Sequence, residues 1–481
     1  MTGLQWNNFL NSNITFTYMD ILIKVGQMVL SLSILIVLHE LGHFLPAKWF
    51  KTRVEKFYLF FDPWFELFKK KIGETEYGIG WLPLGGYVKI SGMIDESFDT
   101  EQMKEEPQPW EFRSKPAWQR LIIMLGGVTV NFILGFFIYS MIFWNYGRDF
   151  LPNSEIVNGI APDSLGMVMG FQKGDKILSV GDYKMDEFNA GSIKMEIIIN
   201  EARTIDIERD GKKMTLQVTE EVAELLSKYE NKGFSLVSPR IPFEIADFAK
   251  ECTGKLFWKK CENAPAEEAG LQLGDQVIAL NGTPTKYFDD FYDIMKGGDY
   301  KSKEVEVTVL RKDTLKNSRD TLVLGVVPNS RGFIGARPMG YGHYFKFGHQ
   351  DYTLAQSIPA GISEGIDFLG SQISAFGQMF RGKIKASDSL GSFLTIGSMF
   401  SPTWDWHSFW KMTAFLSLIL GFINLLPIPA LDGGHVMFLL WEVLTGKKPS
   451  DKVLEYSTMA GFVLLIALMV FALGLDISRI F

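Results

Sequence analysis

The segment His39-Glu40-Leu41-Gly42-His43 ends an uncharged apolar run, residues 25–38, in a chain of 481 residues. On a helix, residues i and i+4 share a face, so both imidazoles can reach one tetrahedral Zn²⁺ ion. Glu40 lies beside them, where it can accept a proton from an attacking water. The chain has only 6 histidines, and ionisable groups within a membrane are costly and usually functional. The pattern therefore predicts a zinc site with Glu40 as its base.

Zinc in a catalytic site needs a third protein ligand, and Asp432 is the best candidate. It lies in the stretch 424–435, Asn-Leu-Leu-Pro-Ile-Pro-Ala-Leu-Asp-Gly-Gly-His, which follows a charge-free run. Pro427 and Pro429 are expected to break the helix there. His435 competes for the third position, and we rank it below Asp432.

Four apolar segments are long enough to cross a membrane. They cover residues 25–38 with their apolar flanks, 121–147, 412–431 and 457–475. Uncharged runs of about 18 or more residues favour spans over buried core helices. A cleaved signal peptide is rejected for the first run because residues 1–20 contain no Lys or Arg.

The positions of Lys and Arg beside the spans predict the orientation of the chain. Basic residues cluster after the first span, before the second, and between the third and fourth. We therefore expect an external N-terminal segment (1–20), a first span (21–48), a cytoplasmic loop (49–116), a second span (117–147), two external β-rich domains (148–240 and 241–340), amphipathic helices at the membrane surface (341–405), a third span (406–441), a second cytoplasmic loop (442–455) and a fourth span (456–476). A fifth span or a re-entrant segment within 352–400 stays open.

The external region contains a repeat at an offset of 100 residues. Gly170-Phe-Gln-Lys-Gly-Asp175-Lys-Ile matches Gly270-Leu-Gln-Leu-Gly-Asp275-Gln-Val, and each copy follows an Ala-Pro pair. A turn of this type that leads into an alternating apolar strand predicts a compact β-rich module, and it resembles the PDZ domain. PDZ folds bind extended peptides by strand addition, which indicates a surface that handles substrate.

Composition excludes several other classes of protein. The 48 Lys and Arg against 55 Asp and Glu leave a net charge of −7 without the basic patch expected for nucleic acid. The 2 cysteines, Cys252 and Cys261, exclude a disulfide-dense scaffold, and whether they pair stays open.

His39-Glu40-Leu41-Gly42-His43 on one span and Asn424…Pro427-x-Pro429…Leu431-Asp432-Gly433 on another resemble the site-2 protease family of intramembrane zinc metalloproteases. With two PDZ-like modules between the second and third spans, the chain is most similar to the RseP type of that family. The resemblance extends from about residue 21 to 475. It implies a multi-pass α-helical membrane protein with four transmembrane helices, two PDZ-like domains and a membrane-associated β-hairpin after the first span.

The resemblance also assigns roles. It implies that His39, His43 and Asp432 bind Zn²⁺ and that Glu40 is the catalytic base. Asn424 matches a residue that contacts substrate, and the segment 78–89, with Gly85, Gly86 and Tyr87, resembles a hairpin that presents an edge strand to the unfolded substrate. Residues matching structural positions near the site are Gly127, Asn131, Pro427 and Pro429.

The implied function is regulated intramembrane proteolysis in the inner (cytoplasmic) membrane of a bacterium. The implied substrates are single-pass membrane proteins, such as an anti-sigma factor or a remnant signal peptide, already cut once by another protease. The PDZ-like domains are expected on the periplasmic side and the active site toward the cytoplasm. The alternative is a zinc transporter or a non-catalytic scaffold. A transporter needs more polar groups along a path, and a scaffold does not need Glu40.

Overall fold

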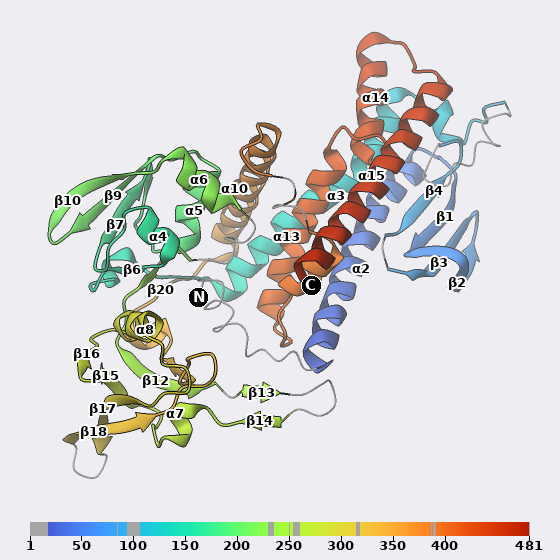
Figure 1. Cartoon of the computed structure of the whole chain (residues 1–481). Coiled ribbons are helices and arrows are strands. Elements are labelled where there is room, and N and C mark those ends of the chain that lie inside the picture. The colour runs from blue at the N-terminus through green and yellow to red at the C-terminus, as the bar shows by residue number, and fades with distance from the viewer. Residues whose placement is uncertain are drawn as a thin grey trace. The chain divides into compact units, whose positions relative to one another are not determined.

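A computed structural model describes residues 18–83, 85–93, 106–228, 235–249, 251–253, 260–313, 318–385, 387 and 391–480. The chain forms two compact units (Figure 1). The membrane unit comprises Phe16–Gly147, Asp351–Ile373 and Leu390–Phe481, and the β-rich unit contains Arg148–Gln350 and Ser374–Ser389. Most of the predicted polar segment, residues 1–20, lies outside the described residues.

Four helices of the membrane unit are long and apolar enough to cross a bilayer, which confirms the predicted four spans. They are α2 (Tyr18–Trp49), α3 (Ala117–Tyr146), α13 (Trp406–Leu425) and α15 (Asp451–Ile480). The prediction that the third span continues to residue 441 is wrong. Helix α13 ends at Leu425, and a separate helix, α14 (Asp432–Thr445), begins after the two prolines.

Helices α2 and α3 approach each other closely at two glycines. A Cβ atom on Gly42 would meet the carbonyl oxygen of Gly126, and one on Gly126 would meet the carbonyl oxygen of Gly42. Small residues allow helix backbones in a membrane to pack at such short range. This contact brings the last turns of α2 against the first half of α3.

Buried hydroxyl groups join α13 to the same pair of helices. Thr413 Oγ1 donates to Ser31 Oγ of α2 at 3.0 Å. Ser417 Oγ donates to the backbone carbonyl of Asn131 in α3 at 2.7 Å. Because a membrane interior offers no water as an alternative partner, such bonds orient the helices against one another.

Helix α15 supports two neighbouring segments without supplying a site residue. Gly461 lies so close to the Pro429 carbonyl that a Cβ atom there would clash with it. Farther along α15, Asp476 accepts hydrogen bonds from the backbone N–H and hydroxyl of Ser392 and Thr395, at the start of α12 (Phe393–Met399). Helix α10 (Leu354–Phe380) is not among the four candidate spans, and its Gly361 and Gly365 pack against Ser140 and Phe136 of α3. Its position at the membrane surface stays a prediction.

The loop after α2 forms a four-stranded sheet, which is larger than the predicted hairpin. Its strands β1 (Val54–Leu59), β2 (Phe61–Ile72), β3 (Thr75–Leu82) and β4 (Tyr87–Ile90) have the order β2-β3-β1-β4. The prediction that residues 78–89 form an edge strand is therefore wrong for 78–82, which lie in the interior strand β3, whereas β4 is an edge. Apolar residues of α2, α3, α14, β1 and β4 share one core with Phe112, and its other buried members are Ala47, Val54, Ile90, Ile123, Met124, Val436 and Leu439.

The β-rich unit contains the predicted repeat as two similar modules. The sheet of module 1 (residues 160–239) has the order β10-β9-β7-β8, and the corresponding part of module 2 (residues 243–338) has the order β18-β17-β15 with β16 beside β15. The strands of module 1 are β6 (Ile160–Pro162), β7 (Lys176–Val180), β8 (Tyr183–Lys184), β9 (Thr204–Arg209), β10 (Lys212–Gln217) and β11 (Val237–Pro239). Those of module 2 are β12 (Phe243–Phe248), β13 (Glu251–Thr253), β14 (Lys260–Glu262), β15 (Gln276–Leu280), β16 (Thr283–Pro284), β17 (Val305–Asp313), β18 (Ser318–Val326) and β19 (Ala336–Pro338). The helices are α4 (Ser164–Val168), α5 (Ala190–Ile198) and α6 (Glu220–Ser227), then α7 (Pro265–Glu268), α8 (Phe288–Gly297) and, after module 2, α9 (Tyr341–Tyr344).

The same buried ion pair stabilises both copies of the repeat. Asp175 accepts two hydrogen bonds from Arg209, whose guanidinium also donates to the Gly170 carbonyl. Asp275 makes the equivalent pair with Arg311, which donates to the Gly270 carbonyl. The aspartates of the two matched motifs therefore tie the same turn to the same strand in each module.

The part of the β-rich unit that contains both modules, Arg148–Gln350, begins and ends in a two-stranded ribbon. Strands β5 (Arg148–Phe150) and β20 (Gly348–Gln350) pair antiparallel, with Asp149 opposite His349. The residues that enter and leave the two modules are thus neighbours. In module 2, β13 and β14 pair so that Cys252 lies opposite Cys261, although the side chains of these cysteines lie outside the described residues and their pairing stays open.

Candidate metal centre

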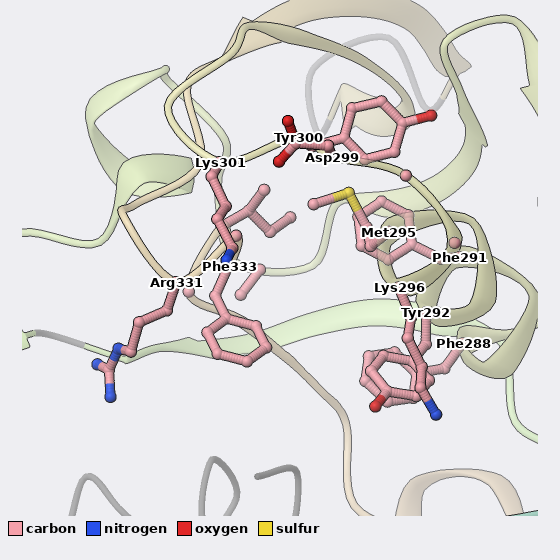
Figure 2. A pocket seen from close by; sticks show the side chains of 16 residues that line it. Phe288, Phe291, Tyr292, Met295, Lys296, Asp299, Tyr300, Lys301, Arg331 and Phe333 are labelled. Carbon is pink, nitrogen blue, oxygen red and sulfur yellow. The ribbon is translucent and has the colours of Figure 1, made fainter. Parts of the chain in front are cut away.

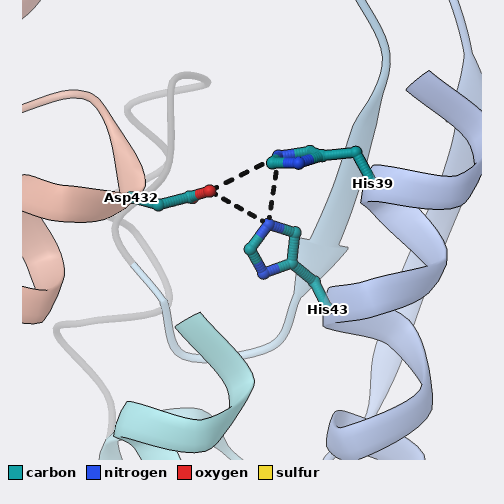
Figure 3. A group of neighbouring side chains, drawn as sticks. All are labelled: His39, His43 and Asp432. Atoms are coloured by element: carbon teal, nitrogen blue, oxygen red, sulfur yellow. Dashed lines mark hydrogen bonds and ion pairs between the residues drawn. The ribbon is translucent and has the colours of Figure 1, made fainter. Parts of the chain in front are cut away.

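Three side chains from two distant parts of the chain converge within the membrane unit. His39 and His43 lie one turn apart on α2, and Asp432 is the first residue of α14 (Figure 3). One ligand atom of each residue lies within 4.8 Å of the others. The structure thus brings together the three residues predicted to bind zinc, whereas His435 is not part of this group.

The separations among the donor atoms fit a tetrahedral zinc ion. Asp432 Oδ2 lies 3.4 Å from His39 Nε2 and 3.3 Å from His43 Nε2, and the two nitrogens are 3.3 Å apart. Ligands about 2.0–2.1 Å from zinc at tetrahedral angles are about 3.3 Å from one another. Asp432 Oδ2 is also buried without a hydrogen-bond donor, as expected of an atom that binds a metal.

Gly127 of α3 makes room for both imidazoles. A Cβ atom at this position would collide with His43 Nε2 and lie 2.7 Å from His39 Cε1. Glycine lets the α3 backbone come this close, which a larger residue would prevent. Gly127 is predicted as a structural residue near the site. In the structure, its missing side chain leaves the space that the two imidazoles occupy.

Helix α3 also contacts the outer nitrogen of each histidine. His43 Nδ1 lies 2.8 Å from the carbonyl oxygen of Ile123, which can only accept a hydrogen bond. His43 Nδ1 therefore carries the proton, and Nε2 keeps its lone pair for a metal. His39 Nδ1 lies 3.0 Å from the Asn131 side chain. Asn131, predicted as a structural residue, is thus in direct contact with a candidate ligand.

Two further predicted residues lie beside the group. Asn424 Nδ2, in the last turn of α13, is 3.4 Å from His39 Nε2. The Glu40 carboxyl group interacts electrostatically with His39, His43 and Asp432. An amide and a carboxylate thus border the three candidate ligands, where they can bind and deprotonate a reactant.

The start of β4 lies against α2 at Glu40. A Cβ atom on Gly86 would lie 2.5 Å from Ile36 Cγ2 and 3.6 Å from Glu40 Cγ, and one on Gly85 would lie 2.6 Å from the ring of Phe61. Both glycines let the chain reach the edge strand without a clash. One edge of β4 has no partner strand among the described residues.

The Tyr87 side chain contacts other residues of its own sheet. Its hydroxyl donates to Asp62 Oδ1 at 3.0 Å, and its ring stacks on that of Tyr58. Burial and the bond to Asp62 raise the pKa of the Tyr87 hydroxyl, which stays protonated at neutral pH. Tyr87 can therefore offer a substrate its backbone, because its hydroxyl is already engaged.

The segment between α13 and α14 holds Asp432 in place. Pro427 and Pro429 stop α13, and Ala430 adopts a positive φ of 80° that non-glycine residues rarely tolerate. Cβ atoms on Gly433 and Gly434 would meet backbone carbonyl groups of 425–428. The two glycines therefore let α14 begin directly against this segment.

Sequence reasoning missed the residues by which α2 and α3 meet. Gly42 and Gly126 make the close contact, and Ile123 acts through a backbone carbonyl that no side-chain motif reveals. One signal was available, since Ile123, Gly127 and Asn131 recur at intervals of four and so share a face of α3.

A separate cavity of about 380 Å³ lies in module 2 of the β-rich unit. Phe291 and Met295 of α8 line one side, and Phe333 of the loop before β19 lines the other (Figure 2). Lys301 and Arg331 also line it. This mixture suits an apolar side chain of an extended peptide, and the predicted peptide-binding surface stays a prediction.

Comparison with known proteins places these features in one family. The model of peptidase family M50 matches residues 27–468. The chain is 26% identical to the regulator of sigma E protease of Haemophilus influenzae over 96% of its own length and 100% of the relative's. It is 27% identical to the regulator of sigma-E protease RseP of Escherichia coli (95% and 98%) and 26% identical to a putative zinc metalloprotease of Neisseria meningitidis (94% and 98%).

We predict that Asp432→Ala lowers the zinc content of the purified protein, because two imidazoles alone hold zinc poorly. Metal analysis after dialysis against a weak chelator should give one zinc per wild-type chain and much less for the variant. Full zinc content in Asp432→Ala would transfer the third position to another residue. The double variant Asp432→Ala/His435→Ala would then show whether His435 takes it.

Proposed function

The chain belongs to peptidase family M50, and we propose that it is an intramembrane zinc metalloprotease that cuts single-pass membrane proteins in or near their transmembrane segment. The observation that carries this proposal is the convergence of His39, His43 and Asp432 beside Glu40, on helices long and apolar enough to cross a bilayer. A scaffold has no use for a carboxylate placed beside three ligand groups.

The proposed reaction is hydrolysis of a peptide bond with Glu40 as the proton carrier. When bound, zinc lowers the pKa of its water and polarises the scissile carbonyl group. Glu40 accepts the proton of the attacking water and returns it to the leaving amine. We propose that the Asn424 amide, which lies 3.4 Å from His39 Nε2, donates to a substrate carbonyl group. His39, His43 and Asp432 hold the metal.

We infer that substrate reaches Glu40 as an extended chain along β4. A transmembrane helix hides its peptide groups in its own hydrogen bonds, so it must unwind before it can be cut. The open edge of β4 offers backbone groups to the unwound chain, and Gly86 places the start of that edge against Glu40. Exposed Trp64, Phe65 and Phe68 on β2 suit the predicted contact of this sheet with lipid.

The names of the relatives favour a role in regulated proteolysis. We propose anti-sigma factors or remnant signal peptides as substrates, which a first protease has already shortened outside the membrane. We also propose that the protein resides in the bacterial inner membrane, with the β-rich unit on the periplasmic side and the metal centre toward the cytoplasm.

Glu40→Gln should abolish cleavage while the protein keeps its zinc, because Glu40 is assigned as a base and not as a ligand. The expected loss of turnover is about 10²–10⁴-fold, measured on a model transmembrane substrate in detergent. Glu364→Gln, which neutralises an exposed carboxylate on α10, is the matched control and should cleave normally. Near-normal turnover by Glu40→Gln would refute this mechanism.

Reporters should reveal the orientation. A reporter placed at Gly211, in the exposed turn between β9 and β10, should be active only outside the cytoplasm. One placed after Lys447, in the loop between α14 and α15, should read as cytoplasmic because Lys447, Lys448 and Lys452 flank it. A cytoplasmic signal at Gly211 would overturn the proposed sidedness.

We propose further that the β-rich unit acts as a size filter, which obstructs substrates that retain a bulky external domain. The β5–β20 ribbon permits a clean test, since residues 151–347 can be replaced by a short Gly-rich turn between strands that are already paired. The excised protein should still bind zinc and cut a short-tailed substrate. It should newly cut a substrate with its full external domain.

A substitution in the cavity of module 2 distinguishes a unit that filters substrates by size from one that recruits them. Under the filter proposal, Met295→Arg, which fills the cavity with a charge, leaves cleavage of the short-tailed substrate unchanged, as does Val323→Arg on the exposed face of β18. Selective loss with Met295→Arg, or with the excised protein that still holds zinc, would mean that the unit recruits substrate instead.

A further inference from the structure

His39 and His43 differ in the partner of their outer nitrogen. The carbonyl oxygen of Ile123 accepts a hydrogen bond from His43 Nδ1, which directs the lone pair of Nε2 toward the other ligands. If His39 Nε2 also binds the metal, His39 Nδ1 must carry a proton too, and it needs an acceptor. The atom that lies 3.0 Å from it is Asn131 Nδ2, which is a donor.

The Asn131 side chain has an acceptor that is not used. Asn131 is fully buried, and its Oδ1 has no hydrogen-bond partner. Rotating the amide by half a turn exchanges Oδ1 and Nδ2 with almost no change of shape. This rotation puts an acceptor opposite the His39 N–H and removes the conflict between two donors.

The position of Asn131 is well determined by its surroundings. Ser417 Oγ donates to its backbone carbonyl group, and Gly127, one turn earlier, lies against both imidazoles. Ile123, Gly127 and Asn131 thus form one face of α3 that contacts the histidines at three successive turns. The Ile123 carbonyl group accepts a hydrogen bond from His43, Gly127 leaves space for both imidazoles, and the Asn131 side chain faces His39.

We propose that Asn131 is a positioning residue of the metal centre, whose Oδ1 accepts a hydrogen bond from His39 Nδ1–H and thereby holds His39 Nε2 toward zinc. This inference rests on the proposed function, because it assumes that His39 binds the metal. It gives Asn131 a role beyond packing α3 against its neighbours. Residues that orient a metal-binding histidine in this way raise metal affinity.

The test compares two isosteric replacements in the full-length purified protein. Asn131→Asp keeps an acceptor and has no amide hydrogens to bury, whereas Asn131→Leu fills the same space without an acceptor. Zinc affinity is measured by competition with a chromophoric chelator, so no protease assay is needed. We expect Asn131→Leu to weaken zinc binding about 10–100-fold and Asn131→Asp to bind at least as tightly as the wild type.

A packing role predicts the reverse order, because leucine suits a buried position between membrane helices and an aspartate does not. Zinc binding by Asn131→Leu equal to the wild type, or weaker binding by Asn131→Asp than by Asn131→Leu, would overturn the proposal. Ser417→Ala, which removes the bond to the Asn131 backbone, controls for altered helix packing and should change zinc affinity less than Asn131→Leu.

Thermal unfolding of the metal-free variants identifies any that fail to fold. If Asn131→Leu is one of them, Asn131→Ala replaces it, and undiminished zinc binding by Asn131→Ala would refute the proposal equally. A wild-type protein that does not bind zinc would refute the proposed function, whereas tight wild-type binding that is insensitive to Asn131 would refute this inference alone.

Discussion

The close contact between α2 and α3 at Gly42 and Gly126 is the constraint on which the metal centre depends. Because the backbones are this near, the two imidazoles reach one face of α3. There the Ile123 carbonyl group accepts a hydrogen bond from His43, and Gly127 leaves space for both rings. A wider separation would leave His43 Nδ1 without its carbonyl acceptor. Burying a polar group without a partner is costly in a membrane, so the helix contact and the ligand geometry stabilise each other.

The third candidate ligand depends on a different kind of constraint. Asp432 follows a segment with two prolines and a strained alanine, residues 426–431, which belongs to neither α13 nor α14. Its shape is imposed by neighbours, including α15, whose Gly461 contacts the Pro429 carbonyl. A ligand that follows such a segment lies where an uninterrupted helix would not carry it. The break between α13 and α14 thus places Asp432 beside His39 and His43.

Much of this arrangement was predictable from local patterns. The i, i+4 histidines, the apolar runs and the repeat around Asp175 and Asp275 each express a short-range rule. The size of the sheet after α2 was not predictable, because the pairing of β1 with β3 joins strands that are parallel and not adjacent in sequence. The hydrogen bond to the Ile123 carbonyl group was not predictable either, because every residue carries such a group and only the tertiary structure brings this one to His43.

The support that α15 gives to the Pro429 segment has a consequence for the timing of synthesis. The two histidines leave the ribosome early, whereas α15, which supports the Asp432 segment, follows that segment in the chain. Until α15 has entered the bilayer, Pro429 lacks the neighbour that shapes it. A chain made only as far as Asp432 therefore contains all three candidate ligands but lacks the helix that packs against the segment before the third.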